Sequence, residues 1–200
     1  MSYTIADAER INAALLEEIA VRQAEEAGVN RSNRNGWHSE SDFFGRTEPA
    51  HAELAQAIYA AARDATARVA PKGADLSGVG MRIMGWINVN PTGAYNVPHD
   101  HPGSFWSGAY YVSNPASDEG NPSAGAISFI DCRSAPAGQP LVQAPVHQGM
   151  HTLRPKAGAM LLFPSSLRHW VQPNDSSEDR VTIAFNVFMF PAGGAAQPRS

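Results

Sequence analysis

The amino-acid sequence predicts a mainly β protein whose N-terminal third is helical. Beyond Gly78, short apolar runs alternate with clusters of Gly, Pro, Asn, Asp and Ser, a pattern typical of strands joined by turns. The 17 glycines and 15 prolines among the 200 residues favour the same turn-rich fold, because both residue types interrupt regular structure. Before Gly78, two segments rich in Ala, Leu, Glu and Arg predict helices.

The first helix is expected over Ile5–Glu26 and the second over Pro49–Val69. In the first segment, Ile11, Leu15 and Ile19 are spaced four residues apart, so they fall on one face of a helix. This apolar face indicates that the helix packs against the rest of the protein.

About eight strands are expected after residue 78, and their spacing is typical of a sandwich, a jelly roll or a barrel. They are Met81–Asn88, Tyr95–His101, Ser107–Val112, Ala126–Asp131, Val146–Arg154, Ala159–Phe163, His169–Gln172 and Val181–Phe190. No linker-like segment separates helices from strands. Residues 1–200 are therefore expected to form a single domain, with a helical part at residues 1–75 and a β body at residues 79–190.

Composition excludes several classes of protein. The chain has 15 Lys and Arg against 19 Asp and Glu, a net charge of −4, which argues against a dedicated nucleic-acid binder. The longest apolar run, Ala159–Pro164, is far shorter than the ~20 residues of a membrane span. The N-terminus has no signal-peptide pattern, and Cys132 is the single cysteine, so a cytoplasmic protein without disulfides is expected. A homodimer is the default expectation for the oligomeric state.

Three histidines are placed so that they can bind a metal ion. His99 and His101 are two residues apart on a predicted strand, where both side chains share a face. His169 begins a later predicted strand. Three protein ligands that leave coordination positions open are typical of a catalytic metal rather than a structural one. An isolated pair of this spacing often binds nothing, so the interpretation depends on the residues that accompany it.

Arg180 follows His169 by eleven residues, and Thr182 shares its face on the last predicted strand. Arginine binds carboxylates through two parallel hydrogen bonds, and a threonine hydroxyl adds a third. A buried arginine beside a metal indicates an anionic ligand, since an unpaired buried cation is costly. The alternative is a surface arginine at the start of an edge strand.

Taken together, these residues resemble the Fe(II)/2-oxoglutarate-dependent dioxygenases, whose pattern is H-x-D/E, a distant His, and an Arg about ten residues later. The segments HDHPGSFWSGAYYVSNP, GAMLLFPSSLRHWVQPN and RVTIAFNVFM are similar to an uncharacterised branch of 2-oxoglutarate–Fe(II) oxygenases. The resemblance covers most of residues 33–190 and is strongest over 79–190. It implies a double-stranded β-helix (jelly roll) with the N-terminal α-helices packed against it.

The resemblance implies that His99, His101 and His169 hold Fe(II). It departs from the family pattern at one position, because His101 stands where the acidic ligand is usual. His101, Asp100 or a water molecule could therefore complete the metal site, and the side-chain alternation of a strand favours His101.

The resemblance further implies that 2-oxoglutarate is the cosubstrate, that O2 is consumed, and that the enzyme hydroxylates a small-molecule or peptide substrate. Arg180 and Thr182 would bind the far carboxylate of 2-oxoglutarate. The residues expected to assist with the cosubstrate are Asn186 and Tyr110, and those expected to contact the substrate are Trp86, Asn88 and Trp106.

Two other interpretations remain open from the residues. Gly93-x5-His99-x-His101 matches the start of the first cupin motif, which predicts a metal-dependent dioxygenase that does not use 2-oxoglutarate. The glutamate expected four or five residues later is absent, since Phe105 and Trp106 stand there. The third interpretation is a non-catalytic jelly roll that binds a small anion.

Overall fold

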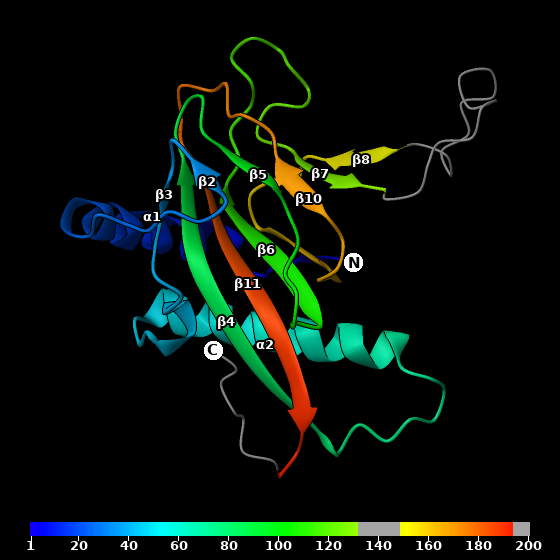
Figure 1. Ribbon diagram of the computed structural model, residues 1–200. Helices are drawn as coiled ribbons and strands as arrows, with labels where there is room; N and C mark the ends of the chain where they lie inside the picture. Colours follow the sequence, from blue (N-terminus) through cyan, green and yellow to red (C-terminus); the bar gives the residue numbers. More distant parts are fainter. Residues whose placement is uncertain (132–148, 194–200) are drawn as a thin grey trace, which may run out of the picture.

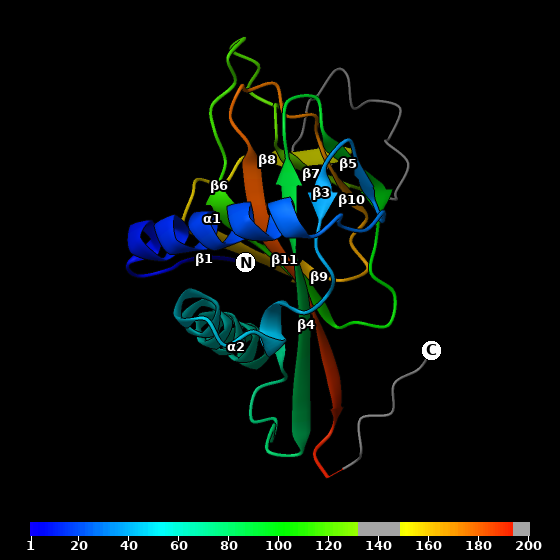
Figure 2. The ribbon, with the colours of Figure 1, turned by 90° about the vertical axis from the view of Figure 1, so that its left-hand side faces the viewer.

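The computed structural model describes residues 1–131 and 149–193, so Cys132 and the first three residues of the strand expected over Val146–Arg154 lie outside the described residues. Two antiparallel sheets face each other, and two helices cover the outer face of the larger sheet (Figures 1 and 2). The helices are α1 (Ala8–Glu25) and α2 (Pro49–Val69), with a short 3-10 helix η1 (Phe43–Gly45) before α2. This is the jelly-roll architecture that the sequence resemblance implies.

The larger sheet has six strands in the order β1-β9-β6-β11-β4-β3. Their bounds are β1 (Ser2–Thr4), β9 (Ala159–Pro164), β6 (Trp106–Ser113), β11 (Arg180–Pro191), β4 (Val79–Asn90) and β3 (Trp37–His38). The smaller sheet has the order β2-β5-β10-β7-β8. Its strands are β2 (Asn33–Arg34), β5 (Tyr95–His99), β10 (His169–Val171), β7 (Ile127–Ile130) and β8 (Met150–Leu153).

The main core lies between the helices and the outer face of the larger sheet. Leu15 of α1 and Ile58 of α2 are fully buried there, in one cluster with Ile87 and Ile183 of the sheet. α2 begins at Pro49, where the missing N–H of proline costs no hydrogen bond. The core therefore explains the one-faced apolar spacing of both helical segments.

Strand alternation separates this core from a polar interior. In β4 and β11, the odd-numbered residues Ile87 and Ile183 face the helices, so even-numbered residues face the smaller sheet. The register pairs Arg180 with Asn90 and Thr182 with Asn88 on that inner face. At the end of these strands that bears Arg180, one side is therefore apolar and the other polar.

All eight expected strands are present in the described residues, and the bounds of α2 match those expected. The first helix begins three residues later than expected. Ser2–Thr4 pairs with β9 instead, and Asp7 adopts a left-handed conformation with φ of 51° before the helix starts. The two-residue strands β2 and β3 were not expected. No helix among the described residues has the length and apolar character needed to cross a membrane.

Replacement of Leu15 by alanine is expected to lower the free energy of unfolding by about 2–5 kcal/mol, because it opens a cavity beneath α1. Its neighbour Leu16 is 39% exposed, so Leu16→Ala is the matched control and is expected to cost less than about 1 kcal/mol. Urea unfolding followed by circular dichroism measures both. Equal losses would contradict this assignment of the helix face.

Candidate active site

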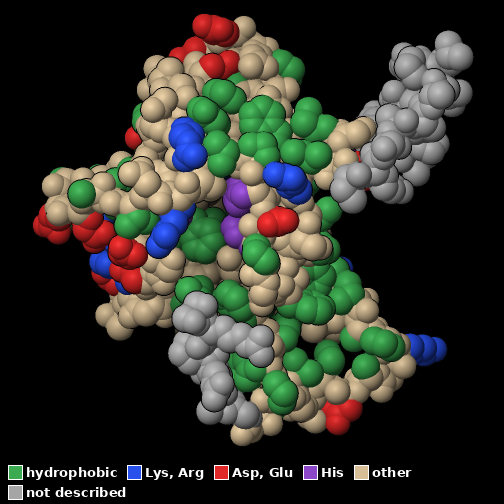
Figure 3. All heavy atoms as spheres, in the orientation of Figure 1, with side chains coloured by type: hydrophobic (Ala, Val, Ile, Leu, Met, Phe, Trp, Pro, Cys, Tyr) green, Lys and Arg blue, Asp and Glu red, His purple; other side chains and the backbone are tan. Residues whose placement is uncertain are grey.

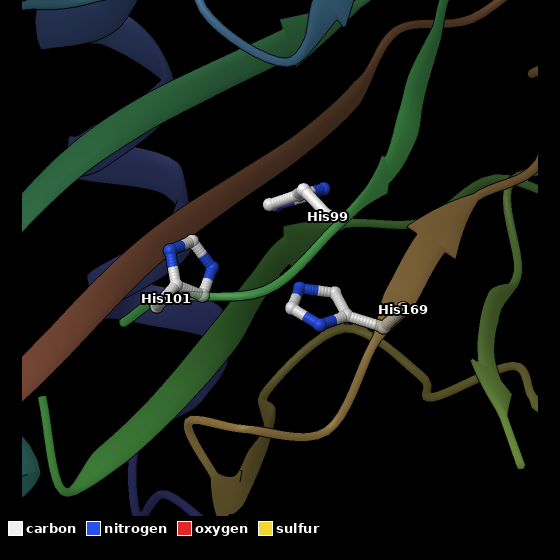
Figure 4. Close-up of side chains that lie close together, drawn as sticks. All are labelled: His99, His101 and His169. Atoms are coloured by element: carbon white, nitrogen blue, oxygen red, sulfur yellow. The ribbon is translucent and has the colours of Figure 1, made fainter. Parts of the chain in front are cut away.

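Three imidazoles point toward one another between the two sheets (Figure 4). One ring nitrogen from each of His99, His101 and His169 lies within 4.8 Å of the corresponding atoms of the other two. The ring centroids are 4.5 Å apart for His99 and His169, and 5.3 Å apart for His101 and His169. This spacing suits a single ion bound by all three side chains.

The sequence analysis expected His101 on a strand, but in the structure it reaches the cluster from the turn that follows β5. β5 ends at His99, where it pairs with His169 of β10. The backbone N–H of His101 donates to the carbonyl of Ser165 at 3.0 Å, and the hydroxyl of Ser104 donates to the carbonyl of His101 at 2.8 Å. These two bonds hold the turn, so His101 faces the other histidines although the strand has ended.

Hydrogen bonds set the ring orientation of two histidines. Nδ1 of His99 lies 2.7 Å from the carbonyl of Val97, and Nδ1 of His169 lies 2.8 Å from the carbonyl of Leu167. Because a carbonyl only accepts, each Nδ1 carries the proton and each Nε2 keeps its lone pair. This is the arrangement in which neighbouring groups prepare an imidazole to bind a metal.

Burial also keeps these imidazoles neutral. It lowers the pKa of His101 to about 3 and the pKa of His169 to about 4. Burial also lowers the pKa of His99. A neutral imidazole is the form that binds a metal. The cluster is therefore suited to a divalent cation at neutral pH.

Asp100 does not belong to the cluster. Its side chain is exposed, and the group of side chains close enough to share an ion consists of the three histidines. Among the alternatives raised by the sequence, the geometry favours His101 over Asp100 as the third protein ligand.

Arg180 lines the same cavity as the three histidines. Its side chain is 2% exposed, its Nε donates to the carbonyl of Gly125 at 2.8 Å, and its guanidinium lies 5.2 Å from the ring centroid of Tyr111. Nη1 lies 3.4 Å from the Thr182 hydroxyl, and Arg180 forms no ion pair with any described residue. A buried cation without a counter-charge is unfavourable, so the site is suited to an anion.

Two buried amide oxygens near Arg180, those of Asn88 and Asn90, have no hydrogen-bond partner among the described residues. The buried hydroxyl of Tyr111 interacts with the Arg180 guanidinium. Buried polar atoms normally have partners, and an unsatisfied group costs about 1–3 kcal/mol. Together with the unpaired guanidinium, these atoms indicate that a polar ligand completes this part of the cavity.

Trp86 forms one wall of the cavity next to His101. Its ring centroid lies 5.9 Å from that of His101, and the imidazole of His38 stacks on it at 5.5 Å with an angle of 12° between the planes. His38 is buried, and its Nδ1 lies 2.6 Å from the Ser39 carbonyl. In the space-filling view, histidine side chains are visible at the bottom of an opening on this face of the molecule (Figure 3).

The structure brings seven of the expected site residues to the cavity lining: Trp86, Asn88, His99, His101, His169, Arg180 and Thr182. Asn186 shares their face of β11 but lies farther along the strand. It accepts a hydrogen bond from the Ser107 hydroxyl at 2.7 Å and does not line the cavity.

Two expectations about β6 are wrong. Tyr110 faces the helices, where its hydroxyl donates to Asn12 at 2.6 Å. Trp106 lies on the same outer face, and its indole N–H donates to Thr66 of α2 at 3.0 Å. The neighbouring Tyr111 faces Arg180 instead. Nearly every residue of β6 is buried, so the sequence shows no alternation from which the inward-facing tyrosine could have been identified.

Gly125 is a further site residue that sequence reasoning missed. It has a φ of +62°, and an added Cβ atom would lie 3.2 Å from Cδ of Arg180. Its role depends on its carbonyl, which accepts from Arg180, and no side-chain pattern signals such a contact. A glycine permits both the left-handed backbone and the close approach of the guanidinium.

Comparisons with known proteins agree with this geometry. A family model described as "Putative 2OG-Fe(II) oxygenase" matches residues 84–186, which is more than half of the chain and includes all three histidines and Arg180. A search of the curated proteins found no match.

Solved structures share the fold. A prolyl-4-hydroxylase from Pseudomonas putida is 18% identical, with a TM-score of 0.58 over 94% of this chain and 91% of that one. HygX from Streptomyces hygroscopicus, solved with nickel and 2-oxoglutarate bound, is 13% identical, with a TM-score of 0.58 over 96% and 83%. SnoN, a non-heme alpha-ketoglutarate-dependent epimerase from nogalamycin biosynthesis, is 14% identical, with a TM-score of 0.62 over 98% and 85%.

Replacement of His169 by alanine is expected to abolish stoichiometric binding of Fe(II), because it removes one of three converging ligands. His151 is exposed on β8 and lies outside the cluster, so His151→Ala is the control and is expected to bind Fe(II) as the wild type does. Anaerobic titration calorimetry measures both variants. Full binding by His169→Ala would show that the ion is held elsewhere.

Proposed function

The chain belongs to the 2OG-Fe(II) oxygenase family, and from this premise we propose that it hydroxylates an organic substrate in the cavity lined by the three histidines and Arg180. The observation that supports this proposal best is the fully buried, unpaired guanidinium of Arg180 in the same cavity as a neutral cluster of metal-binding imidazoles. One part of the cavity suits a divalent cation, and the other suits a carboxylate.

In this proposal, Fe(II) would be held by Nε2 of His99 and of His169, whose Nδ1 atoms bond carbonyls, and by one ring nitrogen of His101. The three ligands are neutral, so the protein supplies no charge to balance the metal. The dianion 2-oxoglutarate supplies that charge, so binding of the metal and binding of the cosubstrate each strengthen the other at this site. Bound together with 2-oxoglutarate, Fe(II) supplies the activation of O2 that oxidises the substrate.

Arg180 and Thr182 bind the far carboxylate of 2-oxoglutarate. Gly125 holds Nε of Arg180, so the remaining guanidinium nitrogens are directed to a ligand. The Tyr111 hydroxyl is buried beside the guanidinium, and its proton can be donated to the same carboxylate. Preorganised donors of this kind position an anion without any rearrangement of the protein.

Apolar side chains close the cavity behind the metal site. The Phe163 ring lies 4.9 Å from the His169 ring at a steep angle, and the Phe129 ring lies 6.0 Å from it. These rings exclude water from one side of the imidazoles. Trp86 forms the opposite wall near the opening, where the substrate contacts the site.

A metal site that does not use 2-oxoglutarate is not favoured. Such an enzyme would leave the guanidinium of Arg180 buried without a counter-ion. A non-catalytic anion binder would account for Arg180 but not for the three prepared imidazoles.

Arg180→Ala is expected to leave Fe(II) binding unchanged and to raise the Kd of 2-oxoglutarate by roughly 100-fold, because it removes charge-assisted hydrogen bonds worth about 1.5–3 kcal/mol each. The measurement is an anaerobic titration of the Fe(II)-loaded protein with 2-oxoglutarate, followed by the visible absorption that chelation produces. Arg63 is exposed on α2, so Arg63→Ala is the control. Unchanged affinity in Arg180→Ala would remove the basis of the proposal.

The adjacent tyrosines of β6 give a matched pair of variants. Tyr111→Phe is expected to raise the Kd of 2-oxoglutarate by about five- to tenfold, the equivalent of one hydrogen bond of about 1 kcal/mol. Tyr110→Phe is expected to leave this Kd unchanged, since its hydroxyl bonds Asn12 on the other face of the sheet. The same titration measures both, and the reverse order of effects would contradict the orientation of β6.

A further inference from the structure

The two longest strands extend beyond the part of the larger sheet that the smaller sheet covers. Figures 1 and 2 show the lower halves of β4 and β11 projecting past β5, β10 and β7, with α2 on the outer side only. The inner face of this extension continues directly from the wall of the active site. Its cross-strand pairs, in order away from the site, are Trp86–Ala184, Met84–Asn186, Arg82–Phe188 and Gly80–Phe190.

This extended face is apolar and partly open to solvent. Met84 is 38% exposed, and Phe188 and Phe190 are each half-buried. Gly80 provides the space for the Phe190 ring, since an added Cβ atom would lie 2.3 Å from a carbon of that ring. The face therefore offers a largely apolar surface that begins at Trp86 and carries one cation, Arg82.

Arg82 is the charged residue among these inner-face pairs. Its guanidinium lies 5.2 Å from the ring centroid of Phe188, and it is half-buried. Its Nε atom is buried without a hydrogen-bond partner, and Arg82 forms no ion pair with any described residue. The guanidinium of Arg82 therefore has no counter-charge and an unsatisfied nitrogen, and its exposed part can bind an anionic group that approaches from solvent.

We propose that this face binds an acidic polypeptide segment of the substrate, with Arg82 paired to an Asp or Glu carboxylate. The inference rests on the hydroxylase function proposed above and adds a substrate class to it. Arg82 lies four residues from Trp86, about 13 Å along the strand at ~3.3 Å per residue, and Gly80 is about 20 Å away. That length fits an extended peptide and exceeds most small metabolites. It places the acidic residue about four positions from the peptide residue that contacts Trp86.

The test is a selection of randomised short peptides by the wild-type protein loaded with Ni(II) and 2-oxoglutarate. The selected peptides are expected to be enriched in Asp and Glu. Arg82→Glu is expected to lose this enrichment and to bind a wild-type-selected peptide about tenfold more weakly, since a like charge replaces the pairing charge. Arg63→Glu, on the opposite side of the sheet, is the charge-matched control and is expected to select as the wild type does.

The outcomes distinguish the two proposals. Arg82 does not line the metal cavity, so Arg82→Glu is expected to keep the absorption given by Fe(II) and 2-oxoglutarate, which also shows that it folds. If that absorption is present but acidic peptides are not enriched, or are enriched equally by Arg82→Glu, the docking inference is overturned and the hydroxylase proposal stands. Absence of the absorption from the wild type would count against the hydroxylase proposal itself. A change of molecular mass in solution caused by Arg82→Glu would assign the face to a second copy of the chain and overturn the inference.

Discussion

The pairing of β4 with β11 is the constraint on which the rest of the structure depends. Their register runs without a shift from Arg180–Asn90 to Pro191–Val79, so one alternation governs both faces along the full length of the two strands. Ile87 and Ile183 pack under the helices, while Arg180, Thr182 and Asn88 enter the cavity. A slip of one residue would exchange these faces, burying charge in the apolar core and leaving the cavity without its cation. The same pairing thus maintains both stability and the anion site.

The sequence was sufficient for the larger features because they have clear periodic or compositional signals. The helix over 49–69 and the eight main strands are bounded by Pro, Gly and Asn, and the histidines and Arg180 form a recognisable combination. The errors occurred where such signals are absent. β6 is buried on both faces, so parity could not distinguish Tyr110 from Tyr111. β2 and β3 have two residues each, too few for any alternation, and His101 points inward because of backbone bonds in a turn. The pairing of β2 and β3 and the bond from His101 to Ser165 all depend on partners at least fifty residues away.

The charges of the site account for its unsatisfied groups. Three neutral imidazoles and one buried guanidinium give the cavity no negative charge from the protein, although both a metal and Arg180 require one. A ligand with two carboxylates satisfies both needs at once, one at the metal and one at Arg180. The carboxylate that is usual beside the first histidine would supply part of that charge permanently. If the three imidazoles hold the metal as proposed, His101 leaves a larger uncompensated charge before the cosubstrate binds, so retention of the metal would depend more strongly on the cosubstrate.

The fold by itself does not determine what is done to the substrate, since a prolyl-4-hydroxylase and an epimerase share it at 18% and 14% identity with this chain. The position of the substrate relative to the metal must decide which reaction occurs. That position depends on residues that hold neither metal nor cosubstrate. Trp86 is such a residue, fixed between the parallel ring of His38 and the nearby ring of His101. β3 supplies His38 to one side of Trp86, so this side chain is packed between two imidazoles. The open inner face of β4 and β11 begins where this wall ends, so the surface that we propose selects the substrate lies on the same two strands that position Arg180.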